Sequence, residues 1–338
     1  MSAYDVAKLA KVSQSTVSRV LNNYPYVKKT TRKRVHEAIK ELGFSPNEIA
    51  RSLANKKTNT IGLIVEDISS SFYSETAHII LREAQKYDYE VIIIDSETDE
   101  ESFNKSMSTL LGKRVDGIIV ASVRKDNKNI IDFFESGFPI ISYNRRTYGS
   151  DNDKFVAVDN KKGAMQAMDY LFDLKHEKIA YISGPLVYST FQERYEGYKE
   201  ALWNKGFEYD DSIVYQDVLS YDKVFNFSLN LMRNVDAPTA FFASTDQMAL
   251  AIMDAASRSG RHIPYDISII GFDDIDIASN PYIGLSTVSQ QKRKMAVMAL
   301  EKLILQIKGE DQKEDSNRII IDSKLITRKT TGINNITS

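Results

Sequence analysis

The sequence predicts two unlike parts: an all-α helix-turn-helix head with a hinge helix, and an α/β body of two doubly wound parallel-sheet lobes. Three observations support this prediction. The first 57 residues hold 12 lysines and arginines against 4 acidic residues, whereas the remaining chain has a net charge of −10. Apolar residues in the N-terminal part recur at helical spacing. From residue 60 onward, runs of isoleucine and valine alternate with helical stretches, which is typical of buried parallel strands.

The composition is that of a globular protein without thiol chemistry. The 338 residues suffice for two or three domains, and 42% of them are hydrophobic and 27% charged. Cysteine is absent, which excludes disulfides, thiolate metal sites and a thiol nucleophile. No apolar run approaches the roughly 18 residues of a membrane span, and the first residues lack the features of a signal peptide. We therefore expect a cytoplasmic protein with no membrane contact.

Three short amphipathic helices are predicted in the head, residues 1–45. In the first, Val6, Leu9 and Ala10 share one helical face. The second spans residues 14–22, and Ser13 is a favourable N-cap for it. The third begins near residue 30 and ends before Gly43, a typical C-cap residue. Two short helices with a tight turn, braced by a third, form a helix-turn-helix unit.

The outward face of the second predicted helix suits the major groove of DNA. It carries small hydroxyls, amides and one guanidinium, and Arg19 can make a bidentate contact to guanine. Basic residues that follow can meet phosphates: Lys28, Lys29, Arg32, Lys33 and Arg34. The candidate base-reading residues are Ser13, Gln14, Ser15, Thr16, Ser18, Arg19 and Asn22. From spacing alone, a packed three-helix domain with a solvated basic face remains the alternative.

Residues 46–59 are predicted to form a hinge helix and linker. Ile49, Ala50, Leu53 and Ala54 recur at helical spacing after Pro46, which can open a helix. Isolated helices below roughly 12–15 residues are marginal in water. We therefore expect this helix to order only against a partner copy, a nucleic acid, or both, and so to couple the body to the head.

The body provides enough predicted strands for two doubly wound sheets. The runs are 61–65, 91–94, 117–120, 139–142, 155–158, 178–182, 240–243 and 268–272, with a further strand at 318–321 after a helix at 291–308. Ligands of such folds bind beyond the carboxyl ends of the strands. Two facing lobes place those ends around one cleft.

Polar and aromatic side chains gather at these strand ends. They are Asp67 with Ser69–Ser71, Phe72 and Tyr73; Ser122; Tyr143, Asn144 and Arg145; Thr245 and Asp246; and Phe272, Asp273 and Asp274. Planar polar groups bind paired hydroxyls, and rings cover the apolar face of a pyranose, so this mixture favours a sugar. Taken singly, Asp67 and Asp246 are better interpreted as helix N-caps.

Two long motifs resemble the lactose/galactose repressor (LacI/GalR) family of bacterial transcriptional regulators. They are Tyr4–Asn22 and Lys40–Asn47, continued by Ala50–Leu53, and the similarity extends over essentially the whole chain. The resemblance implies that the second helix reads the major groove and that paired hinge helices enter the minor groove, with a wedge at Leu53. The implied hinge contacts are Asn47, Ala50, Arg51, Leu53 and Ala54. Lys11 departs from the pattern, since many members have glycine in that turn.

The resemblance also implies a periplasmic-binding-protein-like body with an effector between its lobes. Arg194, Asp273 and Gln290 match effector-holding positions, while Thr245 stands where asparagine is common and Leu219 where many members place an aromatic. The expected effector contacts are Asp67, Ser71, Phe72, Tyr73, Ser122, Asn144, Arg145, Arg194, Leu219, Thr245, Asp246, Phe272, Asp273 and Gln290.

The expected domain boundaries follow from this pattern. The head is 1–45 and the hinge 46–59; the first lobe is 60–158 with 291–317, and the second lobe is 159–290 with 318–338. The chain shows no C-terminal leucine heptads of the kind that assemble tetramers. We expect a homodimer that binds an approximately palindromic operator in double-stranded DNA.

Catalysis is not expected. The sequence has no dinucleotide fingerprint or phosphate loop, and its four histidines are scattered without metal-ligand spacing, so we expect no cofactor and no metal. We predict a sequence-specific dimeric repressor controlled by a small effector, with a sugar favoured over a purine corepressor. Two alternatives remain: a global carbon regulator controlled by a phosphorylated partner protein, and a sugar-binding protein without DNA function.

Overall fold

The computed structural model describes residues 2–21, 24–44, 57–96, 100–149, 152–218, 220–311 and 317–334. The chain forms two compact units, Met1–Thr58 and Asn59–Ser338, with separate hydrophobic cores. The predicted fold class is confirmed for both units. The expected hinge helix lies outside the described residues, with its contacts Asn47, Ala50, Arg51, Leu53 and Ala54, and so do Asn22 and Leu219.

The head contains the three expected helices: α1 (Ala3–Ala10), α2 (Gln14–Leu21) and α3 (Lys29–Leu42). Ser2 and Asp5 form a capping box at α1. The hydroxyl of Ser13 accepts the backbone N–H of Thr16 at 3.2 Å, which confirms its capping role at α2. Lys11 takes the left-handed conformation that its place in the turn requires, with φ of 53°.

The head core is formed by one face of each helix. Its buried side chains are Val6, Ala7, Ala10, Val17, Val20, Val35 and Ala38. The expectation that Leu9 faces inward is wrong, because α3 packs over the Val6–Ala7–Ala10 face and leaves Leu9 41% exposed. The candidate base-reading side chains of α2 remain on the opposite, solvent-facing side.

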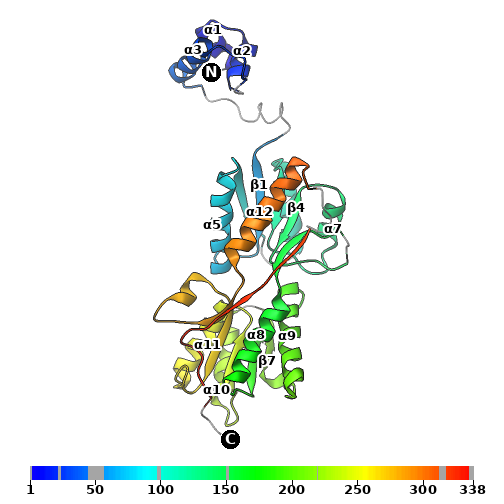
Figure 1. Cartoon of the computed structure of the whole chain (residues 1–338), viewed down its shortest axis with the longest axis vertical. Coiled ribbons are helices and arrows are strands. Elements are labelled where there is room, and N and C mark those ends of the chain that lie inside the picture. Colours follow the sequence, from blue (N-terminus) through cyan, green and yellow to red (C-terminus); the bar gives the residue numbers. More distant parts are fainter. Residues whose placement is uncertain are drawn as a thin grey trace. The chain divides into compact units, whose positions relative to one another are not determined.

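The first lobe of the body is built on a six-stranded parallel sheet in the order β11-β5-β4-β3-β1-β2. Its strands are β1 (Thr60–Val65), β2 (Glu90–Asp95), β3 (Gly117–Val120), β4 (Ile140–Tyr143), β5 (Phe155–Val158) and β11 (Arg318–Ile321). Helices α5 (Ser71–Gln85) and α12 (Lys292–Lys308) lie side by side on one face (Figure 1). Helices α6 (Glu100–Gly112) and α7 (Lys128–Glu135) supply Phe103, Leu110 and Phe134 to the core on the other face.

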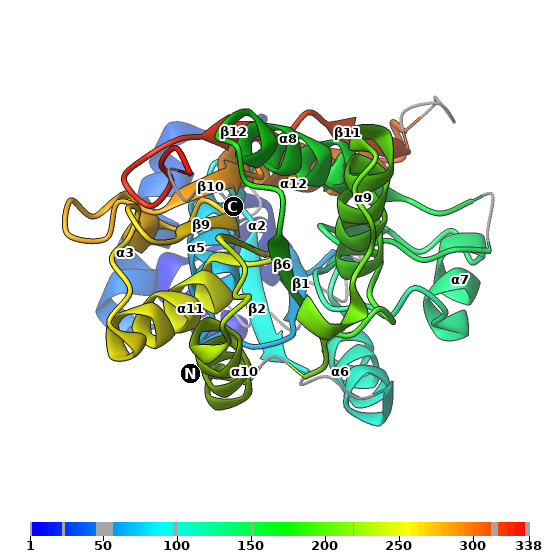
Figure 2. The ribbon, with the colours of Figure 1, turned by 90° about the horizontal axis from the view of Figure 1, so that it is seen from below.

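The second lobe is built on a six-stranded sheet in the order β12-β10-β9-β8-β6-β7, in which only the β10–β12 pair is antiparallel. Its strands are β6 (Ile179–Ser183), β7 (Val214–Gln216), β8 (Ala240–Ala243), β9 (Ser268–Asp273), β10 (Ser286–Ser289) and β12 (Lys324–Ile326). Figure 2 shows α8 (Asn160–Asp173) and α9 (Ser189–Lys205) on one side of this sheet, and α10 (Tyr221–Arg233) and α11 (Asp246–Ser259) on the other. Short 3₁₀ turns, η1 (Asp211–Ile213) and η2 (Asp276–Ser279), complete the lobe.

The chain crosses between the lobes three times, and one expected boundary is wrong. The crossings follow β5, β10 and β11. Residues 318–321 were expected in the second lobe, but β11 pairs in parallel with β5 of the first sheet, from Arg318 beside Phe155 to Ile321 beside Val158. The open edge of β5 accepts this strand, so the third crossing lies between Ile321 and Lys324.

Candidate functional site

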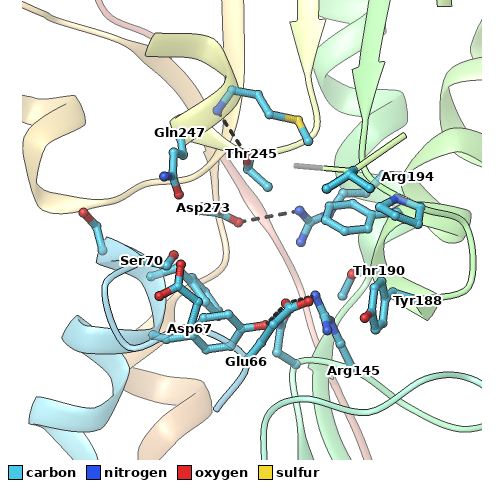
Figure 3. A pocket seen from close by; sticks show the side chains of 18 of the residues that line it. Glu66, Asp67, Ser70, Arg145, Tyr188, Thr190, Arg194, Thr245, Gln247 and Asp273 are labelled. Carbon is cyan, nitrogen blue, oxygen red and sulfur yellow. Dashed lines mark hydrogen bonds and ion pairs between the residues drawn. The ribbon is translucent and has the colours of Figure 1, made fainter. Parts of the chain in front are cut away.

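A cavity of about 510 Å³ lies between the two lobes, at the carboxyl ends of their strands. The first lobe lines it with Glu66, Asp67, Ser70, Ser71, Phe72, Tyr73, Arg124, Asn144 and Arg145. The second lobe and the crossing after β10 line it with Pro185, Val187, Tyr188, Thr190, Phe191, Arg194, Val218, Ser220, Tyr221, Val224, Thr245, Gln247, Met248, Ala251, Asp273, Ile275 and Gln290. Arg194 and Asp273 face each other on one side of the open space, across from Glu66 and Arg145 (Figure 3).

Arg194 is held rigidly at the second-lobe wall by α9. Its Nε donates to Asn160 Oδ1 at 2.9 Å and its Nη1 donates to the Ser244 carbonyl at 2.5 Å. The guanidinium stacks on the Phe272 ring at 3.7 Å, and its Nη1 lies 3.6 Å from Asp273 Oδ1. Burial lowers the pKa of Arg194, although the Asp273 carboxylate opposes this effect. These contacts preorganise the guanidinium toward a ligand in the cavity.

Asp273 ends β9 in a conformation that only a functional or structural constraint maintains. Its φ is 125°, and the following Asp274 is also left-handed at 55°. The amide of Gln290 donates to Asp273 Oδ1 at 2.5 Å. Burial raises the pKa of the Asp273 carboxyl to about 6, against the opposing effect of Arg194 and Gln290. Asp273 is therefore an acceptor at the second-lobe wall whose charge is only partly compensated.

The first-lobe wall carries a buried ion pair. Arg145 Nη2 donates to Glu66 Oε2, which also accepts the Tyr73 hydroxyl at 3.2 Å. Burial by itself lowers the pKa of Arg145, but the Glu66 carboxylate outweighs it and the pKa rises above its ordinary value. Burial raises the pKa of Tyr73 well above its ordinary value, so this phenol stays protonated. From the second lobe, the Tyr188 ring covers the Arg145 guanidinium at 3.7 Å.

Several buried polar atoms of this wall and the facing wall lack a hydrogen-bond partner within the described residues. They are Arg194 Nη2, Arg145 Nε and Nη1, Asn144 Oδ1 and Gln290 Oε1. Buried polar groups normally find a partner, so unpaired ones beside a cavity indicate where a ligand binds. Donors and acceptors on opposite walls, with phenyl and phenol rings between them, suit a polyhydroxylated ligand.

Contacts between the lobes flank the cavity on the α9 side. Glu193 Oε1 accepts from Arg146 Nε at 2.7 Å and from the Tyr148 hydroxyl at 2.8 Å, and its Oε2 accepts from Asn160 at 2.9 Å. Lys125 adds a side-chain contact to Gln192 and a backbone contact to the Val187 carbonyl at 3.0 Å. Asn160 therefore contacts both Arg194, inside the cavity, and Glu193, at the junction of the lobes.

A second junction lies at the start of α12. Glu75 of α5 accepts from Lys292 Nζ at 2.5 Å and from the backbone N–H of Asp276 at 2.9 Å. Lys292 also donates to the Asp274 carbonyl at 2.5 Å. This junction ties the first lobe to the segment that follows Asp273.

Most predicted effector residues within the described chain line this one cavity. They are Asp67, Ser71, Phe72, Tyr73, Asn144, Arg145, Arg194, Thr245, Asp273 and Gln290. The expectation of direct lining is wrong for Ser122, Asp246 and Phe272. Asp246 is fully buried and instead accepts from the Ile275 N–H and the Thr287 hydroxyl. Phe272 lies behind Arg194, and Ser122 is buried two residues beyond the end of β3.

Sequence reasoning missed several residues of the wall, and two groups among them touch Arg145 or precede Arg194. Glu66 directly follows β1, but only its neighbour Asp67 was named among the predicted site residues. The segment from Pro185 to Phe191 follows β6, so the strand-end rule applied to that strand would have found it. Phe191 precedes Arg194 by three residues and lies on the same side of α9, and Tyr188 is the N-cap residue of that helix.

The exposed face of α2 is the candidate nucleic-acid interface of the head. Ser13, Gln14, Ser15, Ser18 and Arg19 are exposed, and Thr16 is half-buried with its hydroxyl 2.8 Å from that of Ser13. Lys28, Lys29, Lys33 and Arg34 are also exposed, whereas Arg32 donates to the Tyr24 carbonyl at 3.0 Å. This surface offers one guanidinium and an amide for base edges, with cations placed for phosphates.

The described part of the chain contains no group of three or more histidine and acidic side chains arranged to hold a metal ion. Among the same residues, no helix is both long and apolar enough to span a bilayer.

Comparison with known proteins gives matches along nearly the whole chain. Residues 58–329 match the model of periplasmic binding proteins and the sugar-binding domain of the LacI family, and residues 2–47 match the model of bacterial regulatory proteins of the lacI family. Catabolite control protein A of Priestia megaterium is 35% identical over 90% of this chain and 91% of its own. The ribose operon repressor of Halalkalibacterium halodurans is 35% identical over 97% and 96%. The solved lac repressor dimer bound to operator and the anti-inducer ONPF is similar with a TM-score of 0.86, at 27% identity over 98% and 99%.

Proposed function

Because this chain belongs to the LacI family of bacterial regulatory proteins, we propose that it is a dimeric repressor whose affinity for operator DNA is controlled by a sugar. The sugar binds in the cavity between the lobes, and the head reads the operator through α2. The protein acts in the cytoplasm, where the chromosomal operator lies, and performs no catalysis. We assign residues 1–45 to DNA recognition and 46–59 to the hinge.

The unpaired polar atoms on the two walls of the cavity carry the sugar proposal. Arg194 Nη2 and Gln290 Oε1 on one side, and Arg145 Nε with Asn144 Oδ1 on the other, offer both donors and acceptors. Hydroxyl groups both donate and accept, so neighbouring hydroxyls of one sugar satisfy such a mixed set. The rings of Phe72, Tyr188 and Phe191 provide apolar surface for the C–H face of the sugar.

DNA recognition in this proposal is divided between α2 and the hinge. Arg19 and Gln14 read base edges, and the basic residues after α2 hold phosphates. Two hinge segments pair on the operator, where Leu53 wedges into a central base step. Dimer symmetry makes the operator an approximate inverted repeat.

Effector control requires only that the sugar bind the two states of the repressor unequally. A hundredfold preference for the state that cannot bind DNA is worth about 2.7 kcal/mol. The sugar alters how the lobes close on one another, and this change withdraws the support that the hinge segments give each other.

The test is a selection from random duplex DNA with purified protein at moderate salt, followed by a sugar screen on the selected site. We expect an enriched inverted repeat with a deformable centre, and loss of binding in the presence of one sugar. The matched control is Arg19→Ala, which changes one exposed side chain of α2. We expect this variant to bind the selected site more weakly than the wild type does.

Three other results lead elsewhere. If a DNA site is enriched only when a purine is added, the effector is a purine corepressor and not a sugar. Enrichment only with a phosphorylated phosphocarrier protein makes the chain a global carbon regulator. No enrichment under any of these conditions refutes the repressor proposal.

A further inference from the structure

The buried pair of Glu66 and Arg145 sets the charge of the cavity's first-lobe wall. Both residues line the cavity, and their exposed fractions are only 8% and 2%. Glu66 Oε2 receives two donors, Arg145 Nη2 and the Tyr73 hydroxyl. Glu66 thus supplies the counter-charge for a guanidinium that is otherwise removed from water.

Arg145 keeps donors available despite this pairing. Its Nε and Nη1 are buried and have no hydrogen-bond partner among the described residues. The Tyr188 ring covers the face of the guanidinium at 3.7 Å, which leaves its edge for hydrogen bonding. The edge of a guanidinium is the usual protein ligand of phosphate and carboxylate.

The formal charges around the cavity cancel. Its charged lining residues within the described chain are Glu66, Asp67, Asp273, Arg124, Arg145 and Arg194, three of each sign. An anionic ligand at the Arg145 edge meets the Glu66 carboxylate, and because both side chains are buried this repulsion is only weakly screened. A neutral hydroxyl or ring oxygen accepts the same N–H groups without that repulsion.

We propose that Glu66 is the residue that makes the cavity select a neutral ligand, because it cancels the charge of Arg145 and thereby excludes phosphorylated and carboxylated ligands. This inference rests on the proposed function in that it takes the cavity as the effector site. The inference adds a rule for the effector. The effector directs hydroxyl or ring oxygens toward Arg145, and the phosphate ester of the same sugar does not act as an effector.

Inorganic phosphate is the probe for this role, measured by isothermal titration on the full chain at pH 7.5 and constant ionic strength. In Glu66→Gln, the amide oxygen still accepts a hydrogen bond but the counter-charge is gone. We expect this variant to bind phosphate at least tenfold more tightly than the wild type, and the double variant Glu66→Gln/Arg145→Gln to lose the gain. Asp236→Asn removes the same charge from a side chain that is 88% exposed, and it controls for net charge and for binding to the basic head.

An unchanged phosphate affinity in folded Glu66→Gln overturns the proposal, as does a gain that survives in the double variant. The wild type provides a second test that needs no variant. D-Glucose with glucose 6-phosphate, and D-ribose with ribose 5-phosphate, are compared by thermal unfolding and titration. We expect any pair that binds to favour the neutral sugar at least tenfold, and equal or tighter binding of the phosphate ester overturns the proposal.

These experiments separate the two proposals. Phosphate binding gained in Glu66→Gln supports the charge rule even if no sugar alters operator binding. Release of operator by a phosphorylated sugar through this cavity contradicts the charge rule while leaving the repressor function intact.

Discussion

Replacing Asp273 by asparagine tests whether the negative charge of this buried carboxylate lowers the free energy of unfolding. Asp273 faces Arg194 at 3.6 Å, accepts from Gln290, and lies in the field of Lys292 and of the buried Asp246. Asparagine has nearly the same shape and retains an acceptor for Gln290, so Asp273→Asn removes mainly the charge.

The expected magnitude follows from the pKa of Asp273, which burial raises from 3.8 to about 6. At 1.36 kcal/mol per pKa unit, ionised Asp273 costs the folded state about 3 kcal/mol. The folded state binds the proton more tightly than the unfolded state, so stability falls as pH rises from about 4 to 6, and the full cost persists above pH 6. Asp246 acts in the same direction, because burial and the Asp273 charge raise its pKa too.

The assay is guanidinium unfolding of wild type and Asp273→Asn between pH 4 and pH 8, followed by far-ultraviolet circular dichroism. We expect the stability of the variant relative to wild type to increase by up to about 3 kcal/mol across this interval, mostly between pH 4 and 6. Asp236→Asn controls for the change in net charge. A difference between the two proteins that does not vary with pH refutes the assignment of a buried, pKa-raised carboxyl to Asp273.

The same carboxylate links effector binding to pH. Sugar hydroxyls that donate to ionised Asp273 stabilise its charged form, so binding releases a proton wherever the free site is still protonated. Effector affinity should therefore fall as pH drops below about 6 in the wild type. In Asp273→Asn this pH dependence disappears together with most of the affinity.

Four further variants test the remaining roles. Arg194→Ala should leave operator affinity intact but abolish release of operator by the effector. Gel-shift titrations with and without effector measure both properties. Release of operator at the effector concentrations that act on the wild type would contradict the role of Arg194. Leu53→Ala should weaken operator binding but not effector binding by calorimetry, and equal operator affinity contradicts the role of the hinge. Arg19→Ala should cost about 1–3 kcal/mol on the selected operator and relax one base position; uniform weakening across sequences would make Arg19 a phosphate contact. Asn160→Ala leaves Arg194 Nε unpaired and should lower the free energy of unfolding by about 1–3 kcal/mol. Release of operator by the effector should be reduced more than effector affinity. Equal losses of release and of affinity would argue that Asn160 does not connect the cavity to the lobe contact.

The fold was largely predictable because the central strands of both sheets are buried on both faces. Continuous apolar runs such as Ile61–Val65 and Val91–Ile94, separated by helical stretches, are typical of parallel strands that helices cover on both sides. The short strands β7, β10 and β12 carry too few apolar residues to produce such a signal, and the sequence reasoning missed them. The lobe of β11 was assigned wrongly because pairing with β5 joins residues more than 160 positions apart, which no local pattern records.

The candidate site was predictable at the level of strand ends but not of side-chain direction. Asp246 and Asp273 both stand at strand ends in the second lobe, yet only Asp273 reaches the cavity. Asp246 does not reach the cavity because its carboxylate accepts a hydrogen bond from the Ile275 N–H, in the loop after β9. This loop is distant from Asp246 in the sequence. Glu66 escaped attention for the same reason, since its partner Arg145 is 79 residues away and nothing local marks the pair.

The geometry gives a physical route by which an occupied cavity alters the contact between lobes. Asn160 uses its oxygen for Arg194 and its amide for Glu193, while Glu193 holds Arg146 and Tyr148 of the first lobe. A ligand that pairs with Nη2 of Arg194 adds a partner to this already ordered guanidinium, and Asn160 connects the occupied site to Glu193. A member of this network that moves loses a hydrogen bond, so a change at Asn160 carries a cost at Glu193. The second junction, through Glu75 and Lys292, ties the loop beside Asp273 to α5. Two residues of the second-lobe wall are therefore connected to lobe contacts: Arg194 through Asn160, and Asp273 through the neighbouring Asp274 and Lys292. Small-molecule control of lobe closure requires such a connection.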